Sequence, residues 1–272
     1  MKRRWSRILV FLAILSILVI GSVAAVLHVR EHLVRNHVQR ILDKVQHLEI
    51  GVSHTCEVEL ELRKEWGSHV SVEGRCDDPD HFFLAIHAQH PPFLSPICHE
   101  RQLSRAAFLF VRGLCWSLQG VSGRTFVLDS WLKGKNGVVS HKSATVFVVV
   151  PDESGEELPA VISAIATAPQ LPRVLPGQSD FQQDKQQAIL HPSYRVYVNT
   201  ARSNADYQPG GRVFYITAWV APDAERSDSE RLFGFALSCI TQIHPCSRQD
   251  IMPAAYAQYE QDARRFQAPP AK

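Results

Sequence analysis

The stretch Ile8–Leu27, ILVFLAILSILVIGSVAAVL, is one uncharged apolar run behind the basic opening Met1–Arg7. Twenty residues of α-helix rise roughly 30 Å, which is the thickness of a bilayer core. The run therefore predicts an N-terminal transmembrane anchor over residues 8–27. By the positive-inside rule, residues 1–7 form a short cytoplasmic tail and the rest of the chain lies outside the cytoplasm.

A removed signal peptide is the alternative interpretation of the same stretch. The basic residues precede a 13-residue apolar segment, Ile8–Ile20, and Ser22 and Ala24 are small residues at cleavage-site spacing. Apolar character continues to Val29, which favours an anchor of full spanning length. Both interpretations place the remaining chain across the membrane.

A second helical segment, residues 28–50, continues from the apolar run. Its apolar residues follow spacings of three, four and seven, which places them on one helical face. They are Leu27, Val34, Val38, Ile41, Val45 and Leu48. We expect this juxtamembrane helix to pack on its own domain, and a short coiled coil is the alternative.

Residues 51–266 have the composition of a folded ectodomain, followed by a disordered tail over residues 267–272. The whole chain is 45% apolar and 21% charged, which are ordinary values for a globular protein. The net charge of +2 comes without a long basic stripe, so nucleic acid is not an implied partner.

The pattern after residue 70 predicts an α+β domain with an antiparallel sheet and C-terminal helices packed on it. Asn136-Gly137 predicts a tight hairpin. Ser227 and Glu230 have capping-box spacing. We expect strands at 70–76, 82–87, 125–132, 138–150, 194–200 and 212–220, a long loop at 151–192, and helices at 101–114, 227–240 and 250–266.

Residues 53–67, SHTCEVELELRKEWG, fit two structures. Strict alternation of Cys56, Val58, Leu60 and Leu62 with glutamates predicts a strand. The same residues are strong helix formers between a capping Ser53 or Thr55 and Gly67. A hairpin would set Cys56 opposite Cys76, whereas a helix makes that bridge unfavourable.

The C-terminal stretch Phe235-Ala-Leu-Ser-Cys-Ile-Thr-Gln-Ile-His-Pro-Cys246, followed by Asp250-Ile-Met-Pro253, resembles a segment of an uncharacterised family of membrane-anchored bacterial proteins. Leu48-Glu-Ile-Gly-Val-Ser53 is also similar, and the resemblance implies a helix over residues 55–66. Such proteins often have a cysteine near position 81, where this chain has His81. The resemblance implies no activity.

Six cysteines, an even number in an exported chain, indicate disulfides with fifteen possible connectivities. The pair Cys239–Cys246 is the best-founded one because it closes a short loop around His244-Pro245. The connectivity of Cys56, Cys76, Cys98 and Cys115 stays open.

Metal-ligating and catalytic patterns are weak. Cys76, His81, His87, His90, Cys98 and His99 are close in sequence, but their spacings match no zinc pattern, and we expect His87 and His90 to lie in a loop. Gly120-Val-Ser122-Gly123 falls short of a nucleophile elbow. The sequence predicts no metal site and no cofactor, and it identifies no catalytic residue.

Two functional classes follow. The first is a non-enzymatic ectodomain, anchored in the cell membrane, that binds an envelope protein or supports an assembly. The second is a hydrolase-like extracytoplasmic enzyme whose catalytic residues come together only in the fold. The missing motifs favour the first class.

Overall fold

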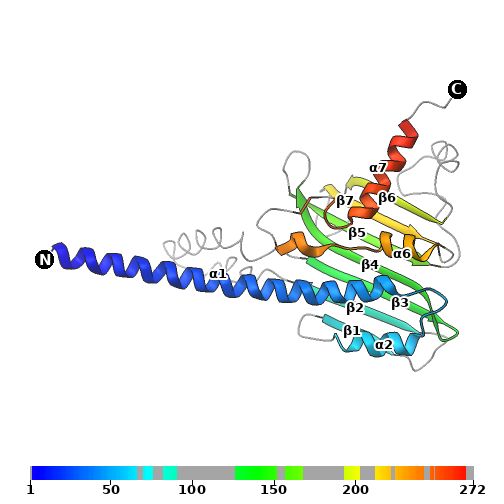
Figure 1. Ribbon diagram of the computed structural model, residues 1–272, viewed down its shortest axis with the longest axis horizontal. Helices are drawn as coiled ribbons and strands as arrows, with labels where there is room; N and C mark the ends of the chain where they lie inside the picture. The colour runs from blue at the N-terminus through cyan, green and yellow to red at the C-terminus, as the bar shows by residue number, and fades with distance from the viewer. Residues whose placement is uncertain are drawn as a thin grey trace.

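The computed structural model describes residues 2–65, 70–75, 82–90, 126–151, 157–167, 193–202, 212–221, 224–241, 246–247 and 249–267. Its longest element is α1 (Lys2–His47), a single helix that joins the apolar run to the juxtamembrane segment without a break. Within the described residues, Ile14–His47 is the helix that is long and apolar enough to cross a membrane. Figure 1 shows its N-terminal half extending away from the labelled strands and its C-terminal half lying across the sheet.

The apolar face of α1 packs on the domain, as its spacing predicted. Val34, Val38, Ile41 and Val45 are buried in the core, and Leu48 packs against it. Each fully buried aliphatic side chain contributes on the order of 2 kcal/mol to folding. The distal half of α1 is therefore a structural part of the domain.

The segment after α1 is helical. α2 (Thr55–Arg63) buries Val58 and Leu62, which are four residues apart on one helical face. Leu60 lies on the opposite side and is 63% exposed. The alternating apolar residues that indicated a strand therefore lie on two different sides of a helix.

Seven strands form one sheet in the described residues, in the order β1-β2-β3-β4-β5-β7-β6. Strands β1 (Val70–Arg75), β2 (Phe83–His90), β3 (Phe126–Lys135) and β4 (Val138–Pro151) are successive antiparallel neighbours. The β3–β4 hairpin turns at Asn136 and Gly137, which have φ of 55° and 77°. Both values are typical of a tight turn that favours Asn-Gly.

The remaining strands correct two expectations. β5 (Glu157–Thr167) lies inside the predicted long loop and occupies the sheet between β4 and β7 (Arg212–Val220). It pairs with β7 in parallel, so the sheet is mixed rather than wholly antiparallel. β6 (Tyr194–Arg202) is antiparallel to β7 at the edge. Every second residue of β5, from Leu158 to Ala166, is buried, and this burial stabilises a strand in which three alanines alternate with β-branched residues.

Helices cover one face of the sheet, and the core lies between the two layers (Figure 1). α6 (Arg226–Leu232) is followed by a short 3₁₀ helix, η1 (Leu237–Thr241), and by α7 (Pro253–Gln267). Phe233, Phe235 and Ile240 are buried in this core, and Tyr259 packs against it. The α+β arrangement with C-terminal helices on the sheet is therefore confirmed.

The predicted capping box at Ser227 is wrong. α6 begins one residue earlier, with Glu225 at the N-cap and no side-chain cap. Glu230 instead accepts a hydrogen bond from Arg226 Nε at 2.7 Å. The chain also leaves the helix at Phe233 and continues extended before η1, so the predicted helix 227–240 is two short elements. The expected helix 101–114 and the tail beyond Gln267 lie outside the described residues.

Candidate binding groove

A groove of about 610 Å³ lies between the C-terminal part of α1 and α2. This volume is typical of a ligand-binding pocket. Its apolar lining comes from α2 and from Leu48, the residue that follows α1, and charged side chains of both signs surround it. The apolar residues are Leu48, Val58, Leu60 and Leu62, and the charged ones are Asp43, Lys44, Glu57, Glu61 and Lys64.

The α1 wall of the groove is held by a buried lysine from the sheet. Lys142 of β4 is 1% exposed, and its Nζ donates hydrogen bonds to the carbonyl oxygens of Gln46 at 2.8 Å and Leu48 at 2.7 Å. These carbonyls belong to the last turn of α1 and the residue that follows it, where a helix leaves acceptors unsatisfied and favours a cation. The ammonium also lies 4.3 Å from the centre of the Phe233 ring.

Burial lowers the pKa of Lys142 to about 8, and the nearby carboxylates of Glu230 and Glu49 act in the opposite direction. The side chain is therefore charged at neutral pH, with its hydrogen bonds directed at the end of α1. This arrangement fixes where α1 ends relative to β4.

The α2 wall is tied to α1 by Glu65, which follows the helix. Its carboxylate lies 3.0 Å from Lys44 Nζ and 3.5 Å from an Arg40 guanidinium nitrogen. The His37 ring contacts the Glu65 carbonyl oxygen at 2.6 Å. Burial alone would raise the pKa of the Glu65 carboxyl, but the Lys44 hydrogen bond and the surrounding positive charges lower it. Glu65 is thus held ionised against α1.

The loop between the two walls is bonded to the β3–β4 hairpin. Gly51 N donates to Val139 O at 2.8 Å, Val139 N donates to Ser53 O at 2.9 Å, and Thr55 N donates to Gly137 O at 3.1 Å. Gly51 has a φ of +80°, a conformation that favours glycine. With both walls and the loop fixed, the groove is preformed, which reduces the entropic cost of binding.

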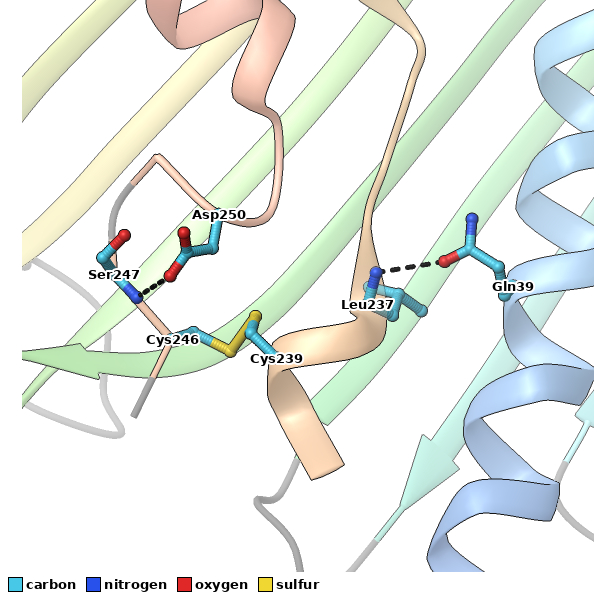
Figure 2. Close-up of a disulfide and its surroundings, with 6 residues drawn as sticks. All are labelled: Gln39, Leu237, Cys239, Cys246, Ser247 and Asp250. Atoms are coloured by element: carbon cyan, nitrogen blue, oxygen red, sulfur yellow. Dashed lines mark hydrogen bonds between the residues drawn. A yellow bond between two sulfur atoms is a disulfide. The ribbon is translucent and has the colours of Figure 1, made fainter. Parts of the chain in front are cut away.

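Neither of the cysteines predicted as a pair lines the groove. The structure joins Cys239 of η1 to Cys246 by a disulfide with a Cα–Cα distance of 5.0 Å (Figure 2). Gln39 of α1 holds the segment leading into η1, because its Oε1 accepts from Leu237 N at 3.0 Å and its Nε2 donates to Phe235 O at 2.8 Å. The disulfide therefore secures the segment that packs beside α1.

Cys56, at the start of α2, is also disulfide-bonded. The other half of that bond lies outside the described residues, as do Cys76, Cys98, Cys115, His81 and His99. Within the described part of the chain, no group of three or more His, Cys, Asp or Glu side chains could hold a metal ion.

His87 and His90 belong to β2 rather than to a loop, which corrects that expectation. His87 Nδ1 lies 2.6 Å from Asp129 Oδ1 of β3, and both side chains are partly exposed. Ser71 of β1 is paired with His87 in the next strand, so serine, histidine and aspartate occupy one cross-strand row. The Ser71 hydroxyl donates to the His87 carbonyl at 3.4 Å. Ser122 lies outside the described residues.

Sequence reasoning missed the groove, although one signal was present. In a helix, the alternation at Cys56, Val58, Leu60 and Leu62 leaves some apolar residues off the packed face. Val58 and Leu62 are buried where they line the groove, and Leu60, which also lines it, stays exposed. Leu60 alone would not indicate a contact surface, and it gains that meaning only as part of the apolar lining that α2 and Leu48 form together.

No family model matches the chain, and neither a curated protein nor a solved structure matches it.

Proposed function

We propose that this chain is a single-pass, membrane-anchored, non-enzymatic ectodomain that binds another envelope protein through the groove between α1 and α2. The observation that carries the proposal is the preformed apolar groove with a mixed-charge rim. Apolar contacts at the centre with charges at the edge are the usual composition of a protein interface.

In the proposed topology, residues 1–7 are cytoplasmic and the domain lies outside the cytoplasm. The basic start before the apolar run supports this orientation. Disulfides also support it, because they form and persist in exported proteins.

A site-specific photocrosslinking experiment tests the binding function. A photoreactive amino acid replaces Glu57 on the rim of the groove in cells that produce the full chain. We expect one discrete protein adduct that is lost in the Leu60→Arg background, because the arginine places a charge on the apolar lining.

Phe83→Arg is the matched control, since Phe83 is a 42% exposed apolar side chain on β2 that does not line the groove. The adduct should persist in this background. An adduct whose yield is unchanged by Leu60→Arg, or the absence of any adduct, contradicts binding at the groove.

A hydrolase is the second candidate, and the cross-strand row Ser71, His87, Asp129 is the observation that favours it. The 2.6 Å contact between His87 Nδ1 and Asp129 leaves Nε2 as the nitrogen that could activate a serine. Catalysis would need the Ser71 hydroxyl to turn from the His87 carbonyl to that nitrogen.

A fluorophosphonate probe distinguishes this candidate. Covalent labelling that is abolished by Ser71→Ala and strongly reduced by His87→Ala supports a serine hydrolase. An unlabelled protein, or labelling that survives Ser71→Ala, rejects it.

A further inference from the structure

Two histidines lie one helical turn apart on α1, directly after the predicted span 8–27. The Nε2 atoms of His28 and His32 are 2.9 Å apart, and the ring centres are separated by 4.4 Å with an interplanar angle of 82°. This contact is on the exposed side of the helix. Residues four apart on a helix share a face, so the backbone itself holds the two imidazoles together.

We propose that His28 and His32 form a two-histidine site for a divalent transition-metal ion, with Cu²⁺ or Ni²⁺ preferred over Zn²⁺. Imidazole nitrogens bind such ions at roughly 2.0–2.1 Å. Two ligands at right angles around the ion then lie roughly 2.9 Å apart, whereas tetrahedral ligands lie roughly 3.4 Å apart. The observed separation of 2.9 Å fits adjacent positions of a square-planar or octahedral ion.

The metal replaces the hydrogen bond between the rings. In the bonded pair, one Nε2 carries the proton and the other accepts it. When the ion binds, the donor ring becomes the Nδ1–H tautomer, so both Nε2 lone pairs face the metal and the number of protons on the pair is unchanged. Water completes the coordination, because no third metal-ligating side chain in the described residues joins the pair.

The site lies at the first turn beyond the predicted bilayer span, outside the groove between α1 and α2. Its preference for Cu²⁺ also agrees with the general order of divalent-ion affinities for nitrogen ligands. A bound ion would link residues i and i+4, and so stabilise the helix where α1 leaves the membrane.

Cu²⁺ titration of the full-length chain in nanodiscs tests the site, with electron paramagnetic resonance as the readout. We expect one site with two equatorial nitrogen ligands. His28→Ala and His32→Ala should each weaken it at least tenfold, and His47→Ala, a substitution of another exposed histidine on α1, should leave it unchanged.

A spacing variant separates chelation from simple histidine content. The double substitution His32→Ala with Val29→His keeps the number of histidines but makes them adjacent in sequence, so that their side chains do not face each other and no new pair four residues apart is created. It should bind as weakly as His32→Ala. Tight binding by this variant, or an unchanged two-nitrogen spectrum in both single variants, overturns the proposal.

Discussion

The two halves of α1 carry similar apolar side chains in opposite environments. In the proximal half, Ile14, Ile17 and Val26 are 53–69% exposed, whereas Val38, Ile41 and Val45 in the distal half are 0–1% exposed. Charged residues distinguish the halves: they are absent from Ile8–Leu27 and interrupt the distal half at regular intervals. The proximal half is therefore apolar on all sides, a pattern typical of a membrane-spanning helix, and the distal half is apolar on the face that meets the sheet.

The largest difference between the halves should appear in a matched isoleucine pair. Ile41→Ala removes a buried side chain and should lower the free energy of unfolding of the domain by about 2–5 kcal/mol. Ile17→Ala removes a 69% exposed side chain from the same helix and should change that free energy by less than about 0.5 kcal/mol. Chemical denaturation in detergent measures both. Equal effects of the two substitutions would remove the distinction.

Lys142→Met tests how the distal end of α1 is fixed. Methionine keeps the apolar stem but leaves the carbonyls of Gln46 and Leu48 without their donor. We expect a loss of about 2 kcal/mol in the free energy of unfolding at pH 7. Faster hydrogen exchange in the last turn of α1, but not near Ile17, should accompany it. An unaltered exchange rate there contradicts the role given to Lys142.

The difference in free energy of unfolding between the parent protein and Lys142→Met should depend on pH in a defined direction. The pKa of Lys142 is about 8 in the folded state and 10.5 for an ordinary lysine, so the unfolded chain holds the proton more tightly between these values. The contribution of Lys142 to the free energy of unfolding therefore rises with pH across this window. The parent protein should gain stability relative to Lys142→Met between pH 8 and pH 10. A difference that stays constant or falls would show that burial does not lower this pKa.

Loss of the Cys239–Cys246 disulfide beside α1 should lower the free energy of unfolding about as much as Lys142→Met does. Replacing Cys239 and Cys246 together by serine opens a loop of seven-residue separation and should cost on the order of 2 kcal/mol. Non-reducing peptide mapping of the parent should recover the two cysteines as one linked pair. Free thiols at both positions would refute the bond.

The smallest expected change is at the groove. Leu60 is 63% exposed, so Leu60→Arg should alter the free energy of unfolding by less than about 0.5 kcal/mol. The same substitution should abolish the proposed partner adduct. A large loss of stability would show that Leu60 serves the core rather than a binding surface.

Sequence patterns predicted those parts of the fold in which a single short-range feature, such as a turn dipeptide or a helical spacing of apolar residues, determines the local structure. The Asn136-Gly137 turn, the strands that flank it and the buried face of α1 all follow from short-range chemistry. The pairing of Cys239 with Cys246 also required only two nearby residues.

The remaining features depend on tertiary contacts. β5 contains three alanines and is flanked by loop-forming residues, so the local pattern did not predict a strand. Its strand conformation is stabilised by pairing with the neighbouring strands, including the parallel pairing with β7. Thr55–Arg63 has a strand-like alternation, yet burial of Val58 and Leu62 on one side favours the helix. The groove arises only when α1 and α2 lie side by side, so no single segment of sequence could predict it.

We propose that the continuous helix α1 changes from a lipid-facing to a core-facing environment along its length. A spin-label scan of residues 14–45 in nanodiscs, with oxygen and a water-soluble nickel complex as relaxants, tests it most directly. We expect oxygen access on all sides of the helix through residue 26, then a three- to four-residue periodicity with minima for both relaxants at Val34, Val38, Ile41 and Val45. Nickel access throughout residues 14–26, or no periodicity beyond residue 34, would contradict it.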